Sequence, residues 1–507
     1  MPRFKEYNYN QMVMLPISFE RQILPGTFEH SVNYLVDGKL DLSIFDSRYN
    51  NDETGRPAYD PAILLKIVLL AYSRGVTSSR KIEALCRENV IFMAISADTS
   101  PHFTTIADFI SSCPEQIAKL FQQVILICDD MGLIGREMFA VDGCKMPSNA
   151  SKEWSGTRTE LKKKAQKIDR AVRYLLKKHR DEDKKGHAEE SVRRREEQQI
   201  EKLLAASDKI EKFLQHNQER LGRNGKAVKS NITDNDSAKM KTGHGVIQGY
   251  NGVAAVDGKH QVVVAAEAFG SGQEHGLLEP MLEQVEENLD EEPLDDAKVL
   301  ADSGYCNAGT LDYLEQRQID GYVADHGFRS RDPRFADAGR YKPSTTDKIR
   351  TKSRFTTEDF QADIENRTCV CPAGKTMWLK CARARIVNRI FMQFQAHQSD
   401  CAGCELRAQC LRSSKQKGAR QVNIPLAVLP RVEVGVLARM KAKIDSAKGR
   451  HIYSRRLGIV EPVFGNIRET LGLHRFTLRG KKKVDGQWKL MTMLHNMLKI
   501  HRYGLAT

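Results

Sequence analysis

Three acidic residues stand where their side chains could do metal-dependent chemistry. Asp142 follows the apolar run 139–141, Asp302 follows the run 298–301, and Glu461 begins an apolar helical pattern. An aspartate after a strand most often only caps a turn, so each acid alone indicates little. Three carboxylates packed together repel, with about 4 kcal/mol between two charges 4 Å apart at an effective dielectric near 20. Such a cluster is stable when hard divalent cations neutralise it, and oxygen ligands favour Mg²⁺ or Mn²⁺.

Two cations held by such acids are suited to phosphodiester chemistry. One cation activates a water molecule or a 3′-hydroxyl group, and the other stabilises the leaving oxygen. The sequence therefore predicts a site formed by Asp142, Asp302 and Glu461, with Mg²⁺ or Mn²⁺ as cofactor.

The segment around Glu461 has the pattern of a helix with two stripes. Pro462 suits the first turn of a helix, because its missing N–H would lack a partner there. Glu461, Gly465 and Arg468 form one stripe that would let a phosphate backbone approach closely. A surface Glu–Arg pair, worth under about 1 kcal/mol, is the simpler alternative. The predicted buried face consists of Val460, Val463, Phe464, Ile467 and Leu471.

Six of the eleven cysteines crowd into residues 369–410. Four of them have the spacing of a structural Zn²⁺ site, in which thiolates close a tetrahedron: Cys371, Cys401, Cys404 and Cys410. Cys369 or Cys381 could replace Cys371 as the first ligand, and reduced cysteines without metal are the alternative. The other five are expected to be small core residues: Cys86, Cys113, Cys128, Cys144 and Cys306.

Composition narrows the class of protein. The chain has 507 residues, a net charge of +14 and a pI of about 9.1, which favours a polyanionic partner, nucleic acid first. No apolar run is long enough to span a bilayer, and residues 1–10 lack the apolar core of a signal peptide. We therefore expect a cytoplasmic protein of two to four domains without a membrane partner.

The N-terminal part has helical periodicity with short connections. Asp60 suits a helix N-cap before Pro61, and three further helices are expected before residue 125. The spacing is similar to a helix-turn-helix in which Arg80 and Lys81 would touch phosphate, and an ordinary helical bundle is equally consistent with it.

The middle of the chain predicts a long helical hairpin followed by a mixed sheet. Apolar residues recur in steps of three and four through most of 152–225, which indicates two helices packed antiparallel. Strands alternate with helices after it, so some strands should pair in parallel and others as hairpins. The predicted strands are 249–256, 261–268, 298–301 and 320–324, and the predicted helices are 275–288 and 308–316.

On these residues the chain resembles the DDE transposases of bacterial insertion sequences, whose catalytic domain is ribonuclease-H-like. Asp142 in Val-Asp-Gly and Asp302 in Ala-Asp-Ser-Gly-Tyr resemble the first two catalytic acids of that family. Its C-terminal signature, Tyr-x2-Arg-x3-Glu-x6-Lys in the best-known branch, resembles the segment with Tyr453, Arg456, Glu461 and Arg468. Four residues rather than three separate Arg456 from Glu461, and arginine replaces the lysine, which alters the geometry of a phosphate contact.

The resemblance implies an α/β fold: a ribonuclease-H-like mixed sheet flanked by helices, with an all-α N-terminal domain, a helical-hairpin insertion and a small cysteine-rich insertion. The expected divisions are a helical DNA-binding domain at 1–135, the first part of the catalytic domain at 136–335 with the hairpin at 150–230, a basic linker and cysteine-rich insertion at 336–444, and the C-terminal catalytic helices at 445–507.

The resemblance also implies an activity and partners. The enzyme would cleave the terminal inverted repeats of an insertion sequence and join the 3′ ends to target DNA, acting on double-stranded DNA as a homo-oligomer, expected to be a dimer, in the nucleoid. Asp142, Asp302 and Glu461 would hold the cations. Strand ends and phosphates would be positioned by Tyr453, Arg456, Arg468, Arg475 and Arg479, with Lys481, Lys482 and Lys483 nearby. The alternatives are a nuclease of the same fold without strand transfer and a non-catalytic DNA-binding descendant.

Overall fold

The chain forms two compact units, of residues 1–326 with 440–507 and of residues 327–439. Within the described part of the chain, no helix is long and apolar enough to cross a membrane. The structure, a computed structural model, describes residues 17–49, 57–183, 190–222, 225–243, 245–289, 294–335, 355–386, 389–411, 418–428 and 435–504.

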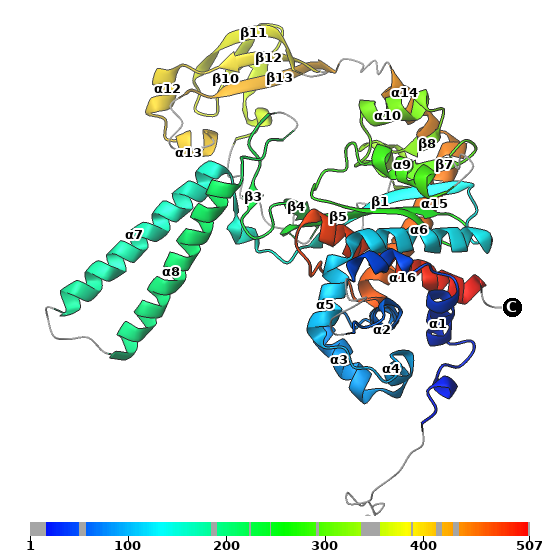
Figure 1. The fold of residues 1–507 in the computed structure, drawn as a ribbon. Coiled ribbons are helices and arrows are strands. Elements are labelled where there is room, and N and C mark those ends of the chain that lie inside the picture. Colours follow the sequence, from blue (N-terminus) through cyan, green and yellow to red (C-terminus); the bar gives the residue numbers. More distant parts are fainter. Residues whose placement is uncertain are drawn as a thin grey trace, which may run out of the picture. The chain divides into compact units, whose positions relative to one another are not determined.

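The first unit begins with a set of helices (Figure 1). The predicted cap is confirmed, because the Asp60 carboxylate accepts the Ala62 N–H at 2.7 Å, directly before a helix that starts at Pro61. Two helices of this part were not predicted, Phe28–Gly38 and Val90–Ile95. The helices are α1 (Phe28–Gly38), α2 (Pro61–Ser73), α3 (Ser79–Glu88), α4 (Val90–Ile95), α5 (Phe103–Ser112) and α6 (Pro114–Asp130).

A mixed sheet forms the centre of the first unit. In spatial order its strands are β4 (Ala238–Thr242), β5 (Gly245–Asp257), β1 (Met138–Pro147), β7 (Lys298–Ala301) and β8 (Asp320–Val323), and β6 (Val263–Phe269) also pairs with β5. β1 is antiparallel to β5 and parallel to β7, which is parallel to β8. The predicted mixed sheet is confirmed, and with the N-terminal helices it is consistent with a ribonuclease-H-like fold.

The helix α16 (Lys481–Lys499) packs against both the sheet and the N-terminal helices. Trp488 is fully buried and its indole N–H donates to the Val253 carbonyl at 2.8 Å. The Asn496 amide accepts the Val263 N–H and donates to the Val263 carbonyl, each at 2.8 Å, and so satisfies the outer edge of β6. This helix therefore joins the two layers of the unit.

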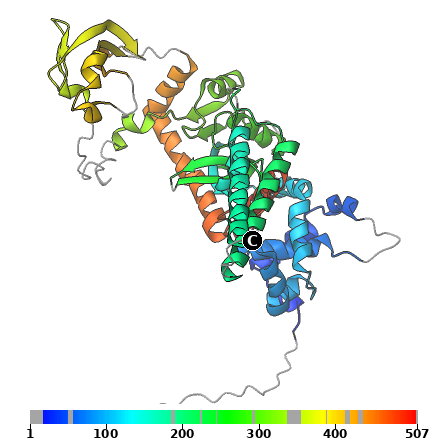
Figure 2. The ribbon, with the colours of Figure 1, turned by 90° about the vertical axis from the view of Figure 1, so that its left-hand side faces the viewer.

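The connecting segments are mostly helical. α7 (Arg158–Asp183) and α8 (Glu190–His216) pack side by side and confirm the predicted hairpin (Figures 1 and 2). The short strands β2 (Ser155–Gly156) and β3 (Ser230–Asn231) pair at its base. α9 (Leu278–Asn288) and α10 (Ala308–Gln316) link the later strands of the sheet, as predicted.

The helix that carries Glu461 begins earlier than predicted. α14 (Val436–Asp445) precedes α15 (Ala447–Gly465), and Pro462 lies inside α15 instead of in its first turn. A proline there leaves the carbonyl four residues earlier, at Gly458, without its helical partner. The Gln261 side chain donates to that carbonyl at 2.9 Å, which accounts for the tolerated proline. The predicted buried face is confirmed: Val460, Val463, Phe464, Ile467 and Leu471 are all buried.

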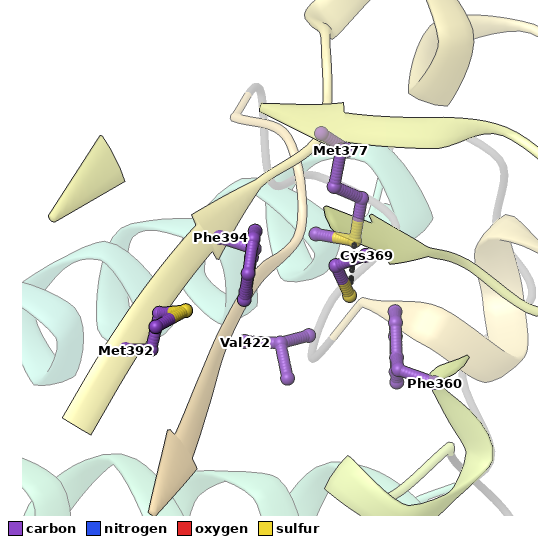
Figure 3. Packing of buried hydrophobic residues seen from close by; sticks show 7 residues of the cluster. Phe360, Cys369, Met377, Met392, Phe394 and Val422 are labelled. Carbon is purple, nitrogen blue, oxygen red and sulfur yellow. Dashed lines mark hydrogen bonds between the residues drawn. The ribbon is translucent and has the colours of Figure 1, made fainter. Parts of the chain in front are cut away.

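The second unit is a small antiparallel sheet with its own core. The order is β13 (Gln421–Val428), β12 (Arg389–Gln395), β11 (Thr376–Ile386), β10 (Thr368–Val370) and β9 (Gln361–Asp363). Phe360, Met377 and Phe394 are among its core residues (Figure 3). Short helices are α11 (Phe328–Arg331), α12 (Gln398–Ala402) and α13 (Arg407–Cys410). Most of the predicted basic linker, residues 336–354, lies outside the described residues.

Candidate active site

Asp142 and Asp302 follow the last paired residues of two adjacent parallel strands. The β1–β7 pairing ends with Val141 opposite Ala301, so each acid is the next residue of its strand. Asp142 was expected at the tip of its strand, and that expectation is wrong. β1 continues to Pro147 because its other edge stays paired with β5, where Asp142 lies opposite Ala254. The two acids therefore sit where β1 and β7 part.

Asp142 is held by an ion pair with Arg456 of α15. Arg456 Nη1 donates to Asp142 Oδ2 at 2.5 Å, and the Gly143 N–H donates to Oδ1 at 2.8 Å. The side chains are only 13% and 8% exposed. Burial raises the pKa of Asp142 to about 6, the Arg456 charge opposes this rise, and the Asp302 charge adds to it. Asp142 is therefore mostly ionised at neutral pH and depends on a nearby positive charge.

Glu274, which precedes α9, faces Asp302 across a glycine. A Cβ atom placed on Gly304 would lie 2.0 Å from Glu274 Oε2 and 2.9 Å from Asp302 Oδ1. A side chain at this position would therefore have to displace the Glu274 carboxylate, and the Gly304 N–H donates to Asp302 Oδ1 at 2.7 Å. Glu274 Oε1 lies 3.2 Å from Lys145 Nζ and accepts from Asn251 Nδ2 at 3.3 Å. The cluster thus contains a carboxylate that the sequence did not indicate.

Two buried polar oxygens at the cluster lack partners. Tyr305 and Asn251 are fully buried, and within the described residues neither Tyr305 Oη nor Asn251 Oδ1 has a hydrogen-bond partner. Burial raises the pKa of Tyr305 well above its usual value, and the charges of Asp142, Glu274 and Asp302 raise it further. A buried hydroxyl or amide oxygen without a partner costs about 1–3 kcal/mol, so a bound group that supplied partners would be favoured.

Glu461 and Arg468 both lie close enough to Cys144 to act on its thiol. Cys144 lies two residues after Asp142 on the same face of β1. Burial raises the pKa of the Cys144 thiol, the Arg468 guanidinium opposes this, and Asp142 and Glu461 add to it. Glu461 is exposed on α15, and Arg468 is exposed in the π-helical turn Asn466–Thr470 that follows it. Cys144 was expected in the core and is instead only partly buried, because it borders this site.

Tyr453 lies one turn before Arg456 on α15. The Arg456 guanidinium stands 5.9 Å from the centre of the Tyr453 ring. Burial raises the pKa of Tyr453, Arg456 opposes the rise, and Asp302 and Asp142 add to it. The structure therefore brings Tyr453 and Arg456 to the two aspartates, although one residue more than the usual spacing separates Arg456 from Glu461.

Arg475 and Arg479 line an open groove beyond the end of β1. Arg475 Nη2 donates to Asn149 Oδ1 at 2.9 Å, and Arg479 Nε donates to the Asn149 carbonyl at 2.8 Å. The groove, of about 660 Å³, is also lined by Trp154 and Lys209. Lys164 and Lys209 lie 4.2 Å and 5.8 Å from the Trp154 ring centre, so an aromatic face is surrounded by positive charge. A second groove, of about 510 Å³, shares Arg479 and is lined by Lys481, Lys482 and Lys483.

Sequence patterns missed Glu274, Tyr305 and Trp154. Glu274 follows the strand predicted at 261–268 and stands in a Ser-Gly-Gln-Glu loop before a helix, so its place after a third strand of the same sheet was an available signal. Tyr305 follows Asp302 in the motif Asp-Ser-Gly-Tyr, and its orientation depends on the turn formed there. Trp154 gave no periodic signal.

The donor set of the acid cluster fits a hard divalent cation. Its carboxylates supply oxygen atoms, and beside them stand the Tyr305 and Asn251 oxygens, which lack partners among the residues described. Among the residues that the structure describes, no group of three or more His, Cys, Asp or Glu side chains could hold a metal ion as it stands. Arg456 already pairs with Asp142, and Lys145 pairs with Glu274. A cation that binds these carboxylates would therefore have to displace both basic side chains.

Four cysteines of the second unit line a common cavity. Cys371, Cys401, Cys404 and Cys410 border a small space of about 30 Å³ between the sheet and the helices α12 and α13. Burial raises the pKa of Cys410, Arg420 opposes this, and Cys401, Cys371 and Cys404 add to it. Cys369 instead faces the core, with its sulfur 3.9 Å from that of Met377 (Figure 3). Cys371 is therefore better placed than Cys369 to join the other three.

Comparison with known families identifies two segments of the chain. The family described as "Transposase DDE domain" matches residues 370–501, and the family described as "Transposase domain (DUF772)" matches residues 17–112. Both families are characteristic of DDE-type transposases of bacterial insertion sequences, and together they indicate a DNA transposase in general. No curated protein matches the chain. Glu461 lies inside the matched DDE segment of this transposase, whereas Asp142 and Asp302 lie between the two matched segments.

Proposed function

We propose that this transposase cuts the inverted-repeat ends of an insertion sequence and joins them to target DNA at the site formed by Asp142, Asp302 and Glu461. The observation that carries the proposal is the place of Asp142 and Asp302 beside each other where two parallel strands part, with Arg456 bound to Asp142. The edge of a sheet where adjacent parallel strands separate is a frequent place for a catalytic site in α/β folds.

The chemistry requires two displacements at phosphorus. In the first, water attacks a phosphodiester at the end of the element, and the leaving oxygen becomes a free 3′-hydroxyl group. In the second, that hydroxyl attacks a phosphodiester of the target and releases a target 3′-hydroxyl. Mg²⁺ or Mn²⁺ bound by the three acids would stabilise charge on the attacking and leaving oxygens.

The chain's own residues would orient the DNA. A cation at Asp142 would compete with Arg456 for the carboxylate, and the released guanidinium would be available to a phosphate of the cleaved strand. Tyr453 lies beside it, and Arg468, exposed in the π-helical turn Asn466–Thr470 that follows α15, would contact a second phosphate. The groove with Arg475, Arg479 and Trp154 combines positive charge with an aromatic face, which suits a phosphate backbone and an unstacked base.

A structural zinc ion in the second unit is proposed for Cys371, Cys401, Cys404 and Cys410. Their common cavity supports it, and their thiols must turn inward to close a tetrahedron. Elemental analysis of the purified chain should find one zinc per chain, and Cys404→Ser should lose it. Wild-type protein purified from zinc-containing medium without zinc would contradict the proposal.

Strand transfer separates this function from its alternatives. Purified protein, labelled inverted-repeat ends, target DNA and Mg²⁺ should yield ends joined to target. Ends that are hydrolysed and never joined would indicate a nuclease, and DNA binding without any cleavage would indicate a non-catalytic descendant. Because both ends must be cut together, we propose a dimer on DNA, which sedimentation with paired ends would detect.

A further inference from the structure

Glu274 is a nearly buried carboxylate of the cluster that the three-acid assignment leaves unused. We propose that Glu274 is a fourth acid of the divalent-cation site, shared with Asp302, and that Lys145 occupies its place until the cation binds. The inference rests on the proposed function, because it takes Asp142, Asp302 and Glu461 as the other acids.

The position of Glu274 is set by its contacts. One carboxylate oxygen faces Asp302 across Gly304, and the other lies 3.2 Å from Lys145 Nζ and 3.3 Å from Asn251 Nδ2. Its side chain is 11% exposed. Gly143 allows this arrangement, because a Cβ atom there would lie 2.6 Å from Asn251 Oδ1. Two glycines therefore leave room for a carboxylate pair that repels itself unless a cation is present.

Independent evidence for a ligand comes from oxygens that are not carboxylates. Tyr305 Oη is fully buried among Asp142, Glu274 and Asp302, and it has no partner within the described part of the chain. Asn251 Oδ1 is also fully buried and also lacks a partner among the described residues, and the Nδ2 atom of the same amide donates to Glu274 Oε1. A hydrated divalent cation held between Glu274 and Asp302 would bring hydrogen-bond partners to both oxygens.

Lys145 explains how the acid stays buried without a cation. Side chains alternate along a strand, so Asp142 and Lys145 project from opposite faces of β1. Arg456 neutralises Asp142 on one face, and Lys145 neutralises Glu274 on the other. Asp302, which follows β7, is near both: its charge acts on Asp142, and its carboxylate faces Glu274 across Gly304. A divalent cation competes with Lys145 for Glu274, which predicts opposite effects of removing the two side chains.

Metal binding by the full-length chain tests the proposal without measuring activity. Free Mn²⁺ is counted by electron paramagnetic resonance for the wild type, Glu274→Gln, Asp302→Asn and Lys145→Met. Glu279→Gln, at an exposed position of α9, is the matched control. Glu274→Gln should weaken Mn²⁺ binding about 10–100-fold, Lys145→Met should strengthen it, and the control should match wild type. The gain from Lys145→Met should vanish when Glu274→Gln is added.

The outcomes separate this inference from the proposed function. Wild-type Mn²⁺ affinity in Glu274→Gln, with binding lost in Asp302→Asn, would overturn the role of Glu274 alone. Unchanged binding in both variants would overturn the metal site itself.

Hydroxyl-radical cleavage of the unmutated protein, with Fe²⁺ replacing Mg²⁺, avoids any folding defect of the variants. The chain should be cut near Asp142, Asp302 and Glu274. Cuts near the two aspartates without one near Glu274 would overturn the inference.

Discussion

Asp142 gives the most direct prediction at the scale of single residues. Asp142→Ala should lower cleavage of inverted-repeat ends on the order of a thousandfold or more, because a cation ligand is lost while the DNA-binding surface remains. A gel-shift titration with the same DNA should give an unchanged dissociation constant. Cleavage that survives in Asp142→Ala would show that the site is assigned wrongly.

Arg456 predicts a stability effect that depends on pH and on metal. Arg456→Met leaves the buried Asp142 charge uncompensated and should lower the free energy of unfolding by about 3 kcal/mol at pH 7. Protonation of Asp142 removes that charge, so the loss should be smaller at pH 5. Mg²⁺ should also reduce the loss, because it replaces the missing positive charge. Urea unfolding measures all three effects, and a loss that is independent of pH and of Mg²⁺ would contradict the explanation.

His495 predicts acid sensitivity. Burial lowers the pKa of His495 to about 4, and the charges of Lys499 and Arg502 lower it further, while the Gln261 carbonyl at 3.0 Å opposes them. The unfolded chain binds this proton near pH 6.5 and the folded chain near 4, so folding loses stability as pH falls through that window. The stability advantage of wild type over His495→Gln should shrink by about 3 kcal/mol between pH 7 and 4. A constant difference in urea unfolding would contradict this.

At the scale of elements, Asn496 ties α16 to the edge of β6. Asn496→Ala leaves the buried N–H and carbonyl of Val263 without partners and should cost at least about 2 kcal/mol. Asn288→Ala removes one part-buried bond, from Asn288 to the Val264 carbonyl, and should cost less. Hydrogen exchange at the Val263 amide should accelerate only in the first variant. Equal costs would argue that these bonds do not order β6.

Strong local patterns allowed most elements to be predicted from the sequence. The strand 298–301 and the helix 308–316 match the structure, because apolar periodicity and turn residues mark their ends. The start of the helix that carries Glu461 was predicted wrongly from Pro462. The Gln261 side chain, which donates to the Gly458 carbonyl left free by this proline, comes from a distant turn that local sequence does not reveal. Asp142 and Asp302 could be indicated by strands that precede them. The place of Glu274 after a predicted strand was also a signal, but its pairing with Asp302 was not predictable, because it depends on the space that Gly304 leaves beside Asp302.

At the scale of the whole molecule, the two units should unfold separately. Each has its own core, and the second unit is built around Phe360, Met377 and Phe394. Calorimetry should therefore resolve two transitions. A zinc chelator should lower only the transition that Cys371→Ser also lowers, because zinc binding contributes about 10–16 kcal/mol to the small folds that depend on it. One transition, or a chelator effect on both, would contradict this.

The order of segments along the chain has a consequence for synthesis on the ribosome. Asp142 and Asp302 are made before the second unit, whereas Glu461 and the helix α16 that joins sheet to N-terminal helices are made after it. At about 5–20 residues per second, a nascent chain carries two acids for roughly 8–32 seconds before the third exists. A messenger truncated anywhere within the second unit would encode a product with the first two acids and no means of completing the site.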